Sequence, residues 1–404
     1  MKKVIIVSEF MLCGGVEKSL LSLLNFLDKE KYNITLLLLK KKGILLDQIP
    51  PHINVIEIEV PSDEEYDILY GKTNALKRAF KERKYFLFLK KFIRGCYLNV
   101  ISNSDEEKRV NYYKMIDKKF SVLNKSYDIA IDYMGYGLLN TFFVAKKIKA
   151  KSKLTWIHFE PSIGMNDFKA FKYYLTDYDK IICVSKDIKN QVKKIIPELT
   201  DKLDVFYNIV DRNYIINESK LNLGFTDTEF DGKRILSIGR LDLQKGFDLA
   251  VPIINKLVKD NYNFRWYIVG EGNLRKTLED QIREYGLERY IFLLGQKTNP
   301  YPYLSQCDYY FQPSRHEGYG IAVAEARAFC KPILATDFAG AREQLKNKET
   351  GLIVQCNEKE IYEGLKSLLD NEQLCLSLIQ NLKNELISKN DIRNDINRLL
   401  GDIE

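Results

Sequence analysis

Short apolar runs alternate along the chain with segments whose apolar residues recur at helical spacing. The runs are rich in valine, isoleucine and leucine, as in strands that are buried on both faces. They lie at residues 2–10, 33–39, 53–60, 127–133, 153–158, 180–185, 234–240, 265–269, 290–293, 331–336 and 351–355. This alternation predicts an α/β fold in which parallel sheets are covered by helices.

The alternation stops in a polar stretch after residue 211 and resumes at Arg234. A chain of 404 residues also exceeds the usual size of a single hydrophobic core. We therefore predict two domains, residues 1–208 and 209–385, and a helical segment at 386–404.

The stretch 311–343 holds the main candidate site. A turn with two glycines, Glu317–Gly320, precedes an alanine-rich run that predicts a helix over residues 321–329 and contains Glu325. A helix start attracts phosphate, and glycines let the backbone approach it. If all eight steps from Glu317 to Glu325 are helical, the two carboxylates lie about 12 Å apart along the axis. Carboxylates so placed suit the acceptance of sugar hydroxyls. A glycine turn without a ligand is the alternative for this segment alone.

Arg240 and Lys245 stand five residues apart in a predicted strand-to-helix loop. Arginine offers a planar fork and lysine a mobile point charge, and together they suit a diphosphate. Such a pair stabilises a departing nucleoside diphosphate as a metal ion does elsewhere. The sequence has no convincing acidic metal-binding cluster, because Asp177 and Asp179 directly precede a predicted strand and suit a turn. We expect no metal.

Two positions in the first half follow predicted strands. Gly14 and Gly15 precede a helix and free the backbone to contact a phosphate or an acceptor, and a plain tight turn is the alternative. His158 ends an apolar strand, and ligands of open α/β sheets bind at that edge. This histidine is therefore placed for function.

Residues 66–119 form an insertion that is longer than an ordinary connection between a strand and the following helix. Within it, the segment Lys72–Arg94 carries nine basic residues, one acidic residue and five aromatic ones. Such a segment suits an anionic lipid surface. A solvated charged face over an ordinary core is the alternative, and no nucleic-acid-binding motif accompanies the segment.

Composition narrows the class of protein. Hydrophobic residues make up 45% of the chain and charged residues 29%, as in soluble globular proteins, and the formal charge is +7. No apolar run is long enough to predict a membrane span, and the apolar start is too short for a cleaved signal. Seven scattered cysteines without a Cys-x-x-Cys pair argue against disulfides and zinc. We expect a cytoplasmic protein.

Several of these motifs, taken in order, resemble those of a known family. They are Gly14-Gly15, Ser237-Ile238-Gly239-Arg240 with Lys245-Gly246, Val269-Gly270-Glu271-Gly272, and Ser314 to Gly320 followed by Glu325, Pro332 and Gly340. The series is similar to that of the group 1 (family 4) retaining glycosyltransferases and covers most of the second half. The resemblance implies the GT-B fold, in which two Rossmann-like domains with parallel sheets face a cleft and a C-terminal helix returns to the first domain.

The resemblance also implies roles for individual residues. Arg240 and Lys245 would hold the diphosphate of a nucleotide sugar, and Glu325 would accept the ribose hydroxyls. The sugar and its phosphate would be held by Glu317, Gly318, Tyr319, Gly320 and Ile321, and the base would pack near Gly295 and Gln296. His158 would face the sugar, which makes His158 and Glu317 the expected catalytic residues, and Gly14 and Gly15 would form a phosphate or acceptor loop.

Two functions remain open. The first is a retaining, metal-independent transfer of a hexosyl or N-acetylhexosaminyl group from a nucleotide sugar, expected to be UDP-linked, to a lipid-linked or cell-surface glycan precursor. The basic segment favours a lipid-linked acceptor, such as an undecaprenyl-diphosphate-linked glycan, and peripheral contact with the inner face of the cell membrane. The second is a non-catalytic GT-B subunit that binds glycan or protein in a glycosyltransferase complex. Such subunits tend to lose charged donor-site residues, which are all present here.

Overall fold

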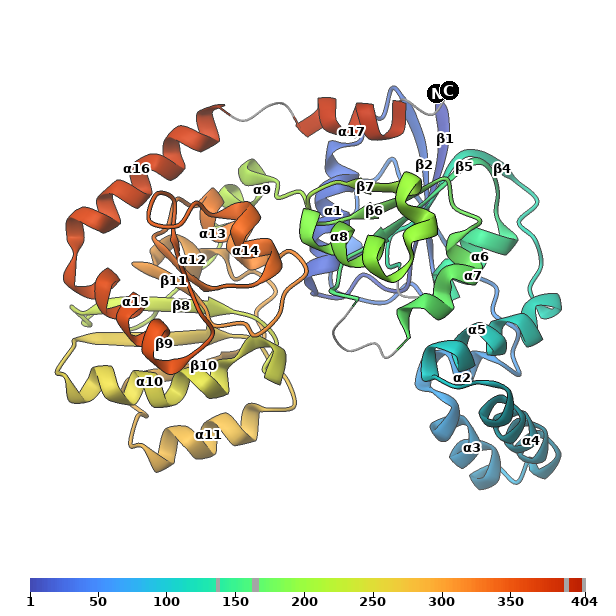
Figure 1. Ribbon diagram of the computed structural model, residues 1–404, viewed down its shortest axis with the longest axis horizontal. Coiled ribbons are helices and arrows are strands. Elements are labelled where there is room, and N and C mark those ends of the chain that lie inside the picture. Colours follow the sequence, from blue (N-terminus) through green and yellow to red (C-terminus); the bar gives the residue numbers. More distant parts are fainter. Residues whose placement is uncertain (136–138, 162–166, 389–391, 402–404) are drawn as a thin grey trace. The chain divides into compact units, whose positions relative to one another are not determined.

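The strands form two separate sheets in which every paired strand runs parallel to its neighbour (Figure 1). The computed structural model describes residues 1–135, 139–161, 167–388 and 392–401. Contacts divide the chain into unit 1, Met1–Phe206 with Asp395–Glu404, and unit 2, Tyr207–Asn394. The predicted α/β class with two parallel sheets is confirmed.

Unit 1 is built on a seven-stranded sheet of order β3-β2-β1-β4-β5-β6-β7. Its strands are β1 (Lys2–Ser8), β2 (Tyr32–Leu38), β3 (Asn54–Glu57), β4 (Ser126–Asp132), β5 (Lys149–Ile157), β6 (Lys180–Cys183) and β7 (Leu203–Val205). The apolar run at 53–60 contributes only β3, because β3 pairs with β2, which itself ends at Leu38. The strand order reverses at β1 and β4, and ligands of such sheets bind by the loops that follow the two strands.

Four helices of unit 1, α2 to α5, lie in the long connection between β3 and β4. All the helices of this unit, in chain order, are α1 (Gly15–Phe26), α2 (Glu65–Tyr70), α3 (Lys72–Lys81), α4 (Tyr85–Ile101), α5 (Asp105–Ile116), α6 (Leu139–Lys147), α7 (Lys172–Leu175), α8 (Lys186–Ile195) and α17 (Ile392–Gly401), with short 3-10 turns at Leu46–Gln48, Asp117–Lys119, Phe168–Phe171 and Pro197–Lys202. The last helix, α17, contacts the first strands: Lys2 Nζ donates to the carbonyl of Gly401 (3.2 Å), and the Tyr32 hydroxyl donates to Asn397 (3.2 Å).

Unit 2 is built on a six-stranded sheet of order β10-β9-β8-β11-β12-β13. Its strands are β8 (Lys233–Ile238), β9 (Phe264–Val269), β10 (Ile291–Gly295), β11 (Tyr309–Gln312), β12 (Ile333–Thr336) and β13 (Leu352–Val354). This is the strand order of dinucleotide-binding Rossmann sheets, with the reversal at β8 and β11. The sequence analysis did not identify β11, because two tyrosines and a glutamine make up most of this four-residue strand.

Two hydrophobic layers cover the faces of the unit 2 sheet. The helices of this unit are α9 (Arg212–Glu218), α10 (Phe247–Lys259), α11 (Arg275–Glu284), α12 (Tyr301–Gln306), α13 (Ile321–Ala328), α14 (Ala339–Gln344), α15 (Glu358–Asp370) and α16 (Glu372–Ser388), with a 3-10 turn at Leu243–Lys245. Helices α10, α11 and α15 pack into one layer, while α9, α12, α13 and α14 pack into the other. The carboxyl ends of β8 and β11 lie beyond these two layers and continue into loops.

Candidate functional site

The loops that follow β8 and β11 are joined by hydrogen bonds. The backbone N–H of Arg315 donates to the carbonyl of Gln244 (2.7 Å), and the Gln244 side chain donates to the carbonyl of His316 (3.0 Å). The Arg315 guanidinium also binds both carboxylate oxygens of Asp248, in the first turn of α10 (2.7 and 2.8 Å). Because bidentate pairs fix geometry as well as energy, the two loops are held in register.

Gly246 brings the two loops into direct contact. Its φ is +69°, and a Cβ at this position would lie 2.0 Å from the carbonyl oxygen of Pro313. A side chain here would both strain the backbone and push the β8 loop away from the β11 loop.

We expect Gly246→Ala to lower the free energy of unfolding by about 3 kcal/mol, the sum of a left-handed backbone cost and a steric clash. Urea unfolding measures this change. Gly286→Ala is the matched control, because Gly286 has a φ of +66° and open space around its Cβ position. Equal losses in the two variants would show that the loops are not held together at Gly246.

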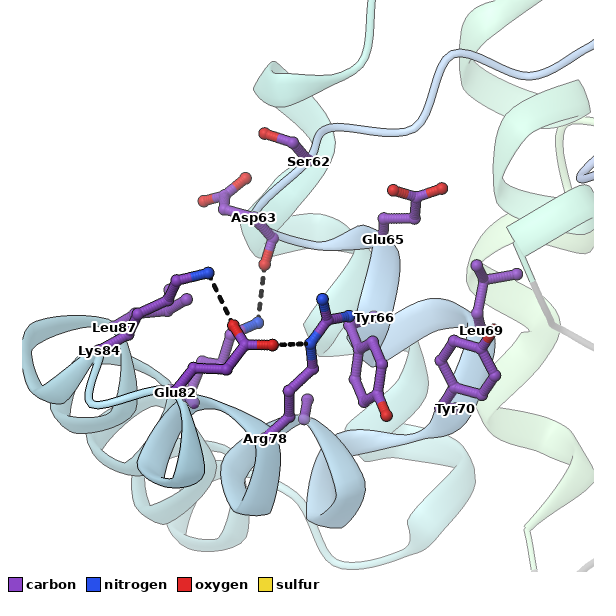
Figure 2. A pocket seen from close by; sticks show the side chains of 13 residues that line it. Ser62, Asp63, Glu65, Tyr66, Leu69, Tyr70, Arg78, Glu82, Lys84 and Leu87 are labelled. Atoms are coloured by element: carbon purple, nitrogen blue, oxygen red, sulfur yellow. Dashed lines mark hydrogen bonds and ion pairs between the residues drawn. The ribbon is translucent and has the colours of Figure 1, made fainter.

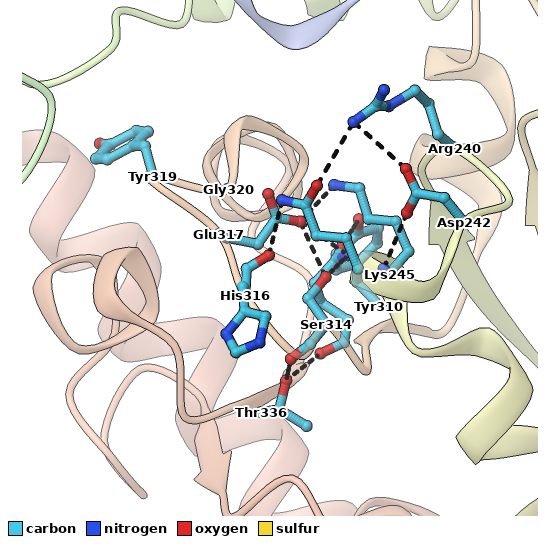
Figure 3. Close-up of polar contacts among 12 residues, drawn as sticks. Arg240, Asp242, Lys245, Tyr310, Ser314, His316, Glu317, Tyr319, Gly320 and Thr336 are labelled. Carbon is cyan, nitrogen blue, oxygen red and sulfur yellow. Dashed lines mark hydrogen bonds and ion pairs between the residues drawn. The ribbon is translucent and has the colours of Figure 1, made fainter. Parts of the chain in front are cut away.

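Lys245 and Glu317 meet at the carboxyl edge of the sheet (Figure 3). The Lys245 ammonium donates to Oε1 of Glu317, whose residue is only 8% exposed. The same oxygen accepts the Ser314 hydroxyl at 2.9 Å. The aliphatic part of Lys245 crosses Gly239, where a Cβ would lie 3.0 Å from Lys245 Cδ. A buried carboxylate thus positions this ammonium.

Arg240 lies on the outer side of the same loop, and its side chain is 74% exposed. It pairs with Asp242 at 3.3 Å, and an exposed pair of this kind contributes little in water. The sequence predicted that Arg240 and Lys245 converge on one anion. In the structure Lys245 contacts Glu317 and Arg240 contacts Asp242, and the convergence on one anion stays a prediction.

Helix α13 begins at Ile321 and is preceded by Gly320 in the left-handed conformation, with a φ of +79°. Its first N–H groups have no partner within the helix, as at any helix start. Gly318 and Tyr319 are buried, and the Gln344 side chain donates to the Tyr319 carbonyl. Only four of the eight steps from Glu317 to Glu325 are helical, so the helix accounts for about 6 Å of rise between Ile321 and Glu325, and not for the about 12 Å that eight helical steps would give.

Glu325 lies on the second turn of α13 and is 3% exposed. Its Oε1 accepts the Tyr301 hydroxyl at 2.9 Å, a contact that sequence reasoning missed. Gly295 ends β10 with a φ of +73°, and the exposed Gln296 follows it at the carboxyl edge. These residues lie where the sequence placed them, at the end of a strand and inside a helix.

In unit 1, His158 directly follows β5 and is 8% exposed. Its Nε2–H donates to the carbonyl of Tyr133 at 2.8 Å, while its Nδ1 is buried and has no hydrogen-bond partner among the described residues. Burial lowers the pKa of His158 to about 4. The ring is therefore neutral near pH 7, and Nδ1 is an acceptor for a hydroxyl group.

The Tyr133 carbonyl that holds His158 belongs to a peptide group whose N–H, that of Met134, donates to the carboxylate of Asp132 at the end of β4 (3.2 Å). This fully buried carboxylate accepts the hydroxyls of Thr141 (2.7 Å) and Thr155 (2.9 Å) and the N–H of Gly135 (3.1 Å). Burial raises the pKa of Asp132, and these hydrogen bonds oppose the shift. Sequence reasoning missed Asp132, although its position at the end of a predicted apolar strand was a usable signal.

Glu9 follows β1, the neighbour of β4 in the sheet, and was also missed. Burial, and then the nearby charges of Asp132 and Glu17, raise the pKa of Glu9 to about 7. Gly15 begins α1, and a Cβ on Gly14 would lie 2.2 Å from a carboxylate oxygen of Glu17. The predicted glycine loop therefore lies at the start of α1, beside the carboxylate of Glu17.

The described residues contain no group of three or more His, Cys, Asp and Glu side chains arranged to hold a metal ion. Nor does any helix within the described ranges have the length and apolar character needed to cross a membrane.

Comparisons with known proteins agree with this architecture. The chain superimposes on a crystal structure of Anabaena Alr3699/HepE in complex with UDP and glucose, with a TM-score of 0.70 over 100% of each chain at 15% identity. That likeness shows the fold, and the predicted GT-B class, with two Rossmann-like domains, is confirmed.

Two sequence relatives of 30% identity or more match about half of the chain. An uncharacterised glycosyltransferase of Methanocaldococcus jannaschii is 33% identical over 53% of this chain and 56% of its own length. A Campylobacter jejuni N-acetylgalactosamine-N,N'-diacetylbacillosaminyl-diphospho-undecaprenol 4-alpha-N-acetylgalactosaminyltransferase is 30% identical over 49% of this chain and 53% of its own length. The chain thus spans about half the length of these curated relatives.

The family of group 1 glycosyl transferases matches residues 226–385. This range contains both loops of the unit 2 site, helix α13 and the end of β10. Residues 226–385 are therefore similar to the group 1 glycosyl transferases.

Proposed function

We propose that the chain is a retaining glycosyltransferase that works without a metal ion. It transfers a hexosyl or N-acetylhexosaminyl group from a UDP-sugar to a lipid-linked or cell-surface glycan precursor. The observation that carries this proposal is the meeting of Lys245, Glu317 and the start of α13 at one sheet edge, with Arg240 exposed on the adjoining loop. A cation pair beside a helix start suits a diphosphate.

The names of two similar proteins support the choice of substrates. The Campylobacter jejuni relative acts on a diphospho-undecaprenol-linked sugar, and the Anabaena structure holds UDP and glucose. We propose an undecaprenyl-diphosphate-linked glycan as the acceptor and UDP as the nucleotide. We also propose a cytoplasmic location and peripheral contact with the inner face of the membrane through residues 72–94.

In the proposed reaction, Lys245 exchanges Glu317 for a phosphate oxygen of the donor, and Arg240 binds the same diphosphate. The bond between the anomeric carbon and the phosphate oxygen breaks, and the two cations stabilise the leaving diphosphate. The acceptor hydroxyl attacks the same face, and its proton passes to the departing phosphate oxygen. Glu317 and the turn Gly318–Ile321 hold the sugar, and Glu325 accepts the ribose hydroxyls.

Three other parts of the chain have proposed roles. His158 contacts the transferred sugar through its acceptor Nδ1. The base packs near Gly295 and Gln296. Gly14 and Gly15 border the acceptor.

We expect UDP release from at least one UDP-sugar when a soluble analogue of an undecaprenyl-diphosphate-linked glycan is supplied, and we expect EDTA to leave the rate unchanged. A coupled assay of UDP measures both, and NMR of the product reports the anomeric configuration. Binding of UDP without turnover of any donor would instead favour a non-catalytic subunit. Loss of activity in EDTA would refute the metal-independent mechanism.

A further inference from the structure

Helix α4 of unit 1 has its apolar side chains on the outside. Phe86, Leu89, Ile93, Tyr97 and Val100 recur at spacings of three and four residues and are 84, 53, 58, 52 and 84% exposed. We call these five residues the α4 stripe. Residues at this spacing share one face of a helix, and the stripe runs about 21 Å along the axis. A stripe of this kind normally faces a protein core.

Two of the three charged residues of α4, Lys91 and Arg94, point the opposite way, into unit 1. Lys91 pairs with Asp67 of α2, and both side chains are almost fully buried. Arg94 donates to Glu64 (2.6 Å) and to Asp67 (3.0 Å). Buried ion pairs add little net stability compared with apolar packing. Folding alone therefore does not explain why α4 turns its cations inward and its apolar residues outward.

The surface around the α4 stripe is basic. Glu82 is the one acidic residue between Gly71 and Asn103, and Arg78 and Lys84 (2.7 Å) already bind it. This ion-pair chain borders a pocket of about 310 Å³ between α2, α3 and α4 (Figure 2). Lys77, Lys81 and Arg83 are exposed and have no ion pair within the described part of the chain. Between Gly71 and Asn103 the exposed cations thus outnumber the acids, while Asp63 and Glu65 also line the pocket.

We propose that the α4 stripe seats unit 1 on an anionic lipid bilayer, with α4 lying in the plane of the membrane surface. An interfacial helix buries an apolar face among the acyl chains while nearby lysine and arginine side chains bind anionic headgroups. Lys90 lies four residues after Phe86 on α4, and its side chain is 56% exposed, with its ammonium 3.9 Å from Asp63. The exposed Arg83 lies just before the start of the helix. A second copy of the chain fits less well, because its surface would carry the same positive charge.

The α4 stripe would form the membrane contact proposed above, and it would do so by burying apolar area as well as by attracting anionic lipid. The segment Lys72–Arg94 suggested attraction by its cations, yet Lys91 and Arg94 are turned inward. The stripe supplies the apolar area, continues beyond the segment to Val100, and leaves the remaining cations to select anionic lipid. The inference does not depend on the transfer reaction.

The full chain is mixed with vesicles of phosphatidylcholine, with or without phosphatidylglycerol, and binding is measured by flotation. We expect the unaltered chain to bind the anionic vesicles. Phe86→Ser with Val100→Ser should weaken the partition coefficient on the order of a hundredfold, about tenfold for each residue. Leu223→Ser is the matched control, because Leu223 is 86% exposed and lies in unit 2.

Charge is tested separately. Arg83→Gln with Lys90→Gln should reduce the preference for anionic over neutral vesicles about tenfold or more, since each cation near the surface contributes about 1 kcal/mol. Circular dichroism checks that every variant is folded. No binding by the unaltered chain, or equal binding by the stripe variant, would overturn the proposal.

Cys96 offers a direct readout, because it is exposed and lies seven residues after Leu89 on the edge of the stripe. A polarity-sensitive fluorophore at Cys96, with Cys356→Ser, should shift to the blue when anionic vesicles are added. A label at Cys356, with Cys96→Ser, should not shift. Light scattering without lipid is the remaining check: a dimer that the stripe substitutions dissociate would show that a second copy covers this face.

Vesicle binding and UDP release are measured independently. The flotation assay contains no sugar nucleotide, and the UDP-release assay contains no vesicles. Failure of one proposal therefore leaves the test of the other intact.

Discussion

Lys245→Met is expected to lose both UDP affinity and stability. The ammonium would contribute a charge-assisted contact to the diphosphate, and its removal should weaken UDP binding by about 1.5–3 kcal/mol, or roughly ten- to a hundredfold. It also pairs with Glu317, which is 8% exposed, so the variant leaves a buried carboxylate without its cation. We expect a further loss of about 3 kcal/mol in the free energy of unfolding. Calorimetry with UDP and urea unfolding measure the two effects.

A second substitution separates the contribution of Lys245 to UDP binding from its contribution to stability. In the double variant Lys245→Met with Glu317→Gln, the buried charge is gone, and we expect most of the lost stability to return while UDP affinity stays low. Lys276→Met, an exposed lysine of the same unit, is the matched control and should change neither quantity. If the double variant bound UDP as the unaltered chain does, Lys245 would be a structural partner of Glu317 and nothing more.

Between about pH 4.5 and 6.5, His158 and Glu9 are expected to change stability in opposite directions. The pKa of His158 is lowered to about 4 from 6.5, so the unfolded state binds more protons and stability falls as the pH falls. The pKa of Glu9 is raised to about 7 from 4.5, so the folded state binds more protons and its contribution is lost as the pH rises. Each effect is about 3 kcal/mol, and together they nearly cancel.

Single substitutions should expose each effect. In Glu9→Gln, urea unfolding should show stability falling by about 3 kcal/mol from pH 7 to pH 4.5. In His158→Gln, stability should instead fall as the pH rises over the same range. His52→Gln is the control, because His52 is exposed in unit 1. Parallel pH profiles for the two variants would contradict the assigned protonation of these groups.

The sequence by itself determined the α/β class and the local parts of the unit 2 site. An apolar run, a glycine turn and an alanine-rich helix are encoded by neighbouring residues, so β8, its loop and α13 could be predicted from local periodicity. Positions that follow predicted strands also located His158, and the same rule would have identified Glu9 and Asp132. The family resemblance then supplied roles that the residues alone left open.

The tertiary structure decided which of these parts meet. Pairing of β8 with β11 brings Lys245 to Glu317 across 72 residues, and strand order depends on packing between distant segments that periodicity does not record. The tertiary structure also decided which face of α4 points outward. An amphipathic pattern has the same spacing whether its apolar side lies inside or outside, and the inward ion pairs of Lys91 and Arg94 come from α2 and the turn before it. Burial in the folded structure therefore assigned the two faces of α4.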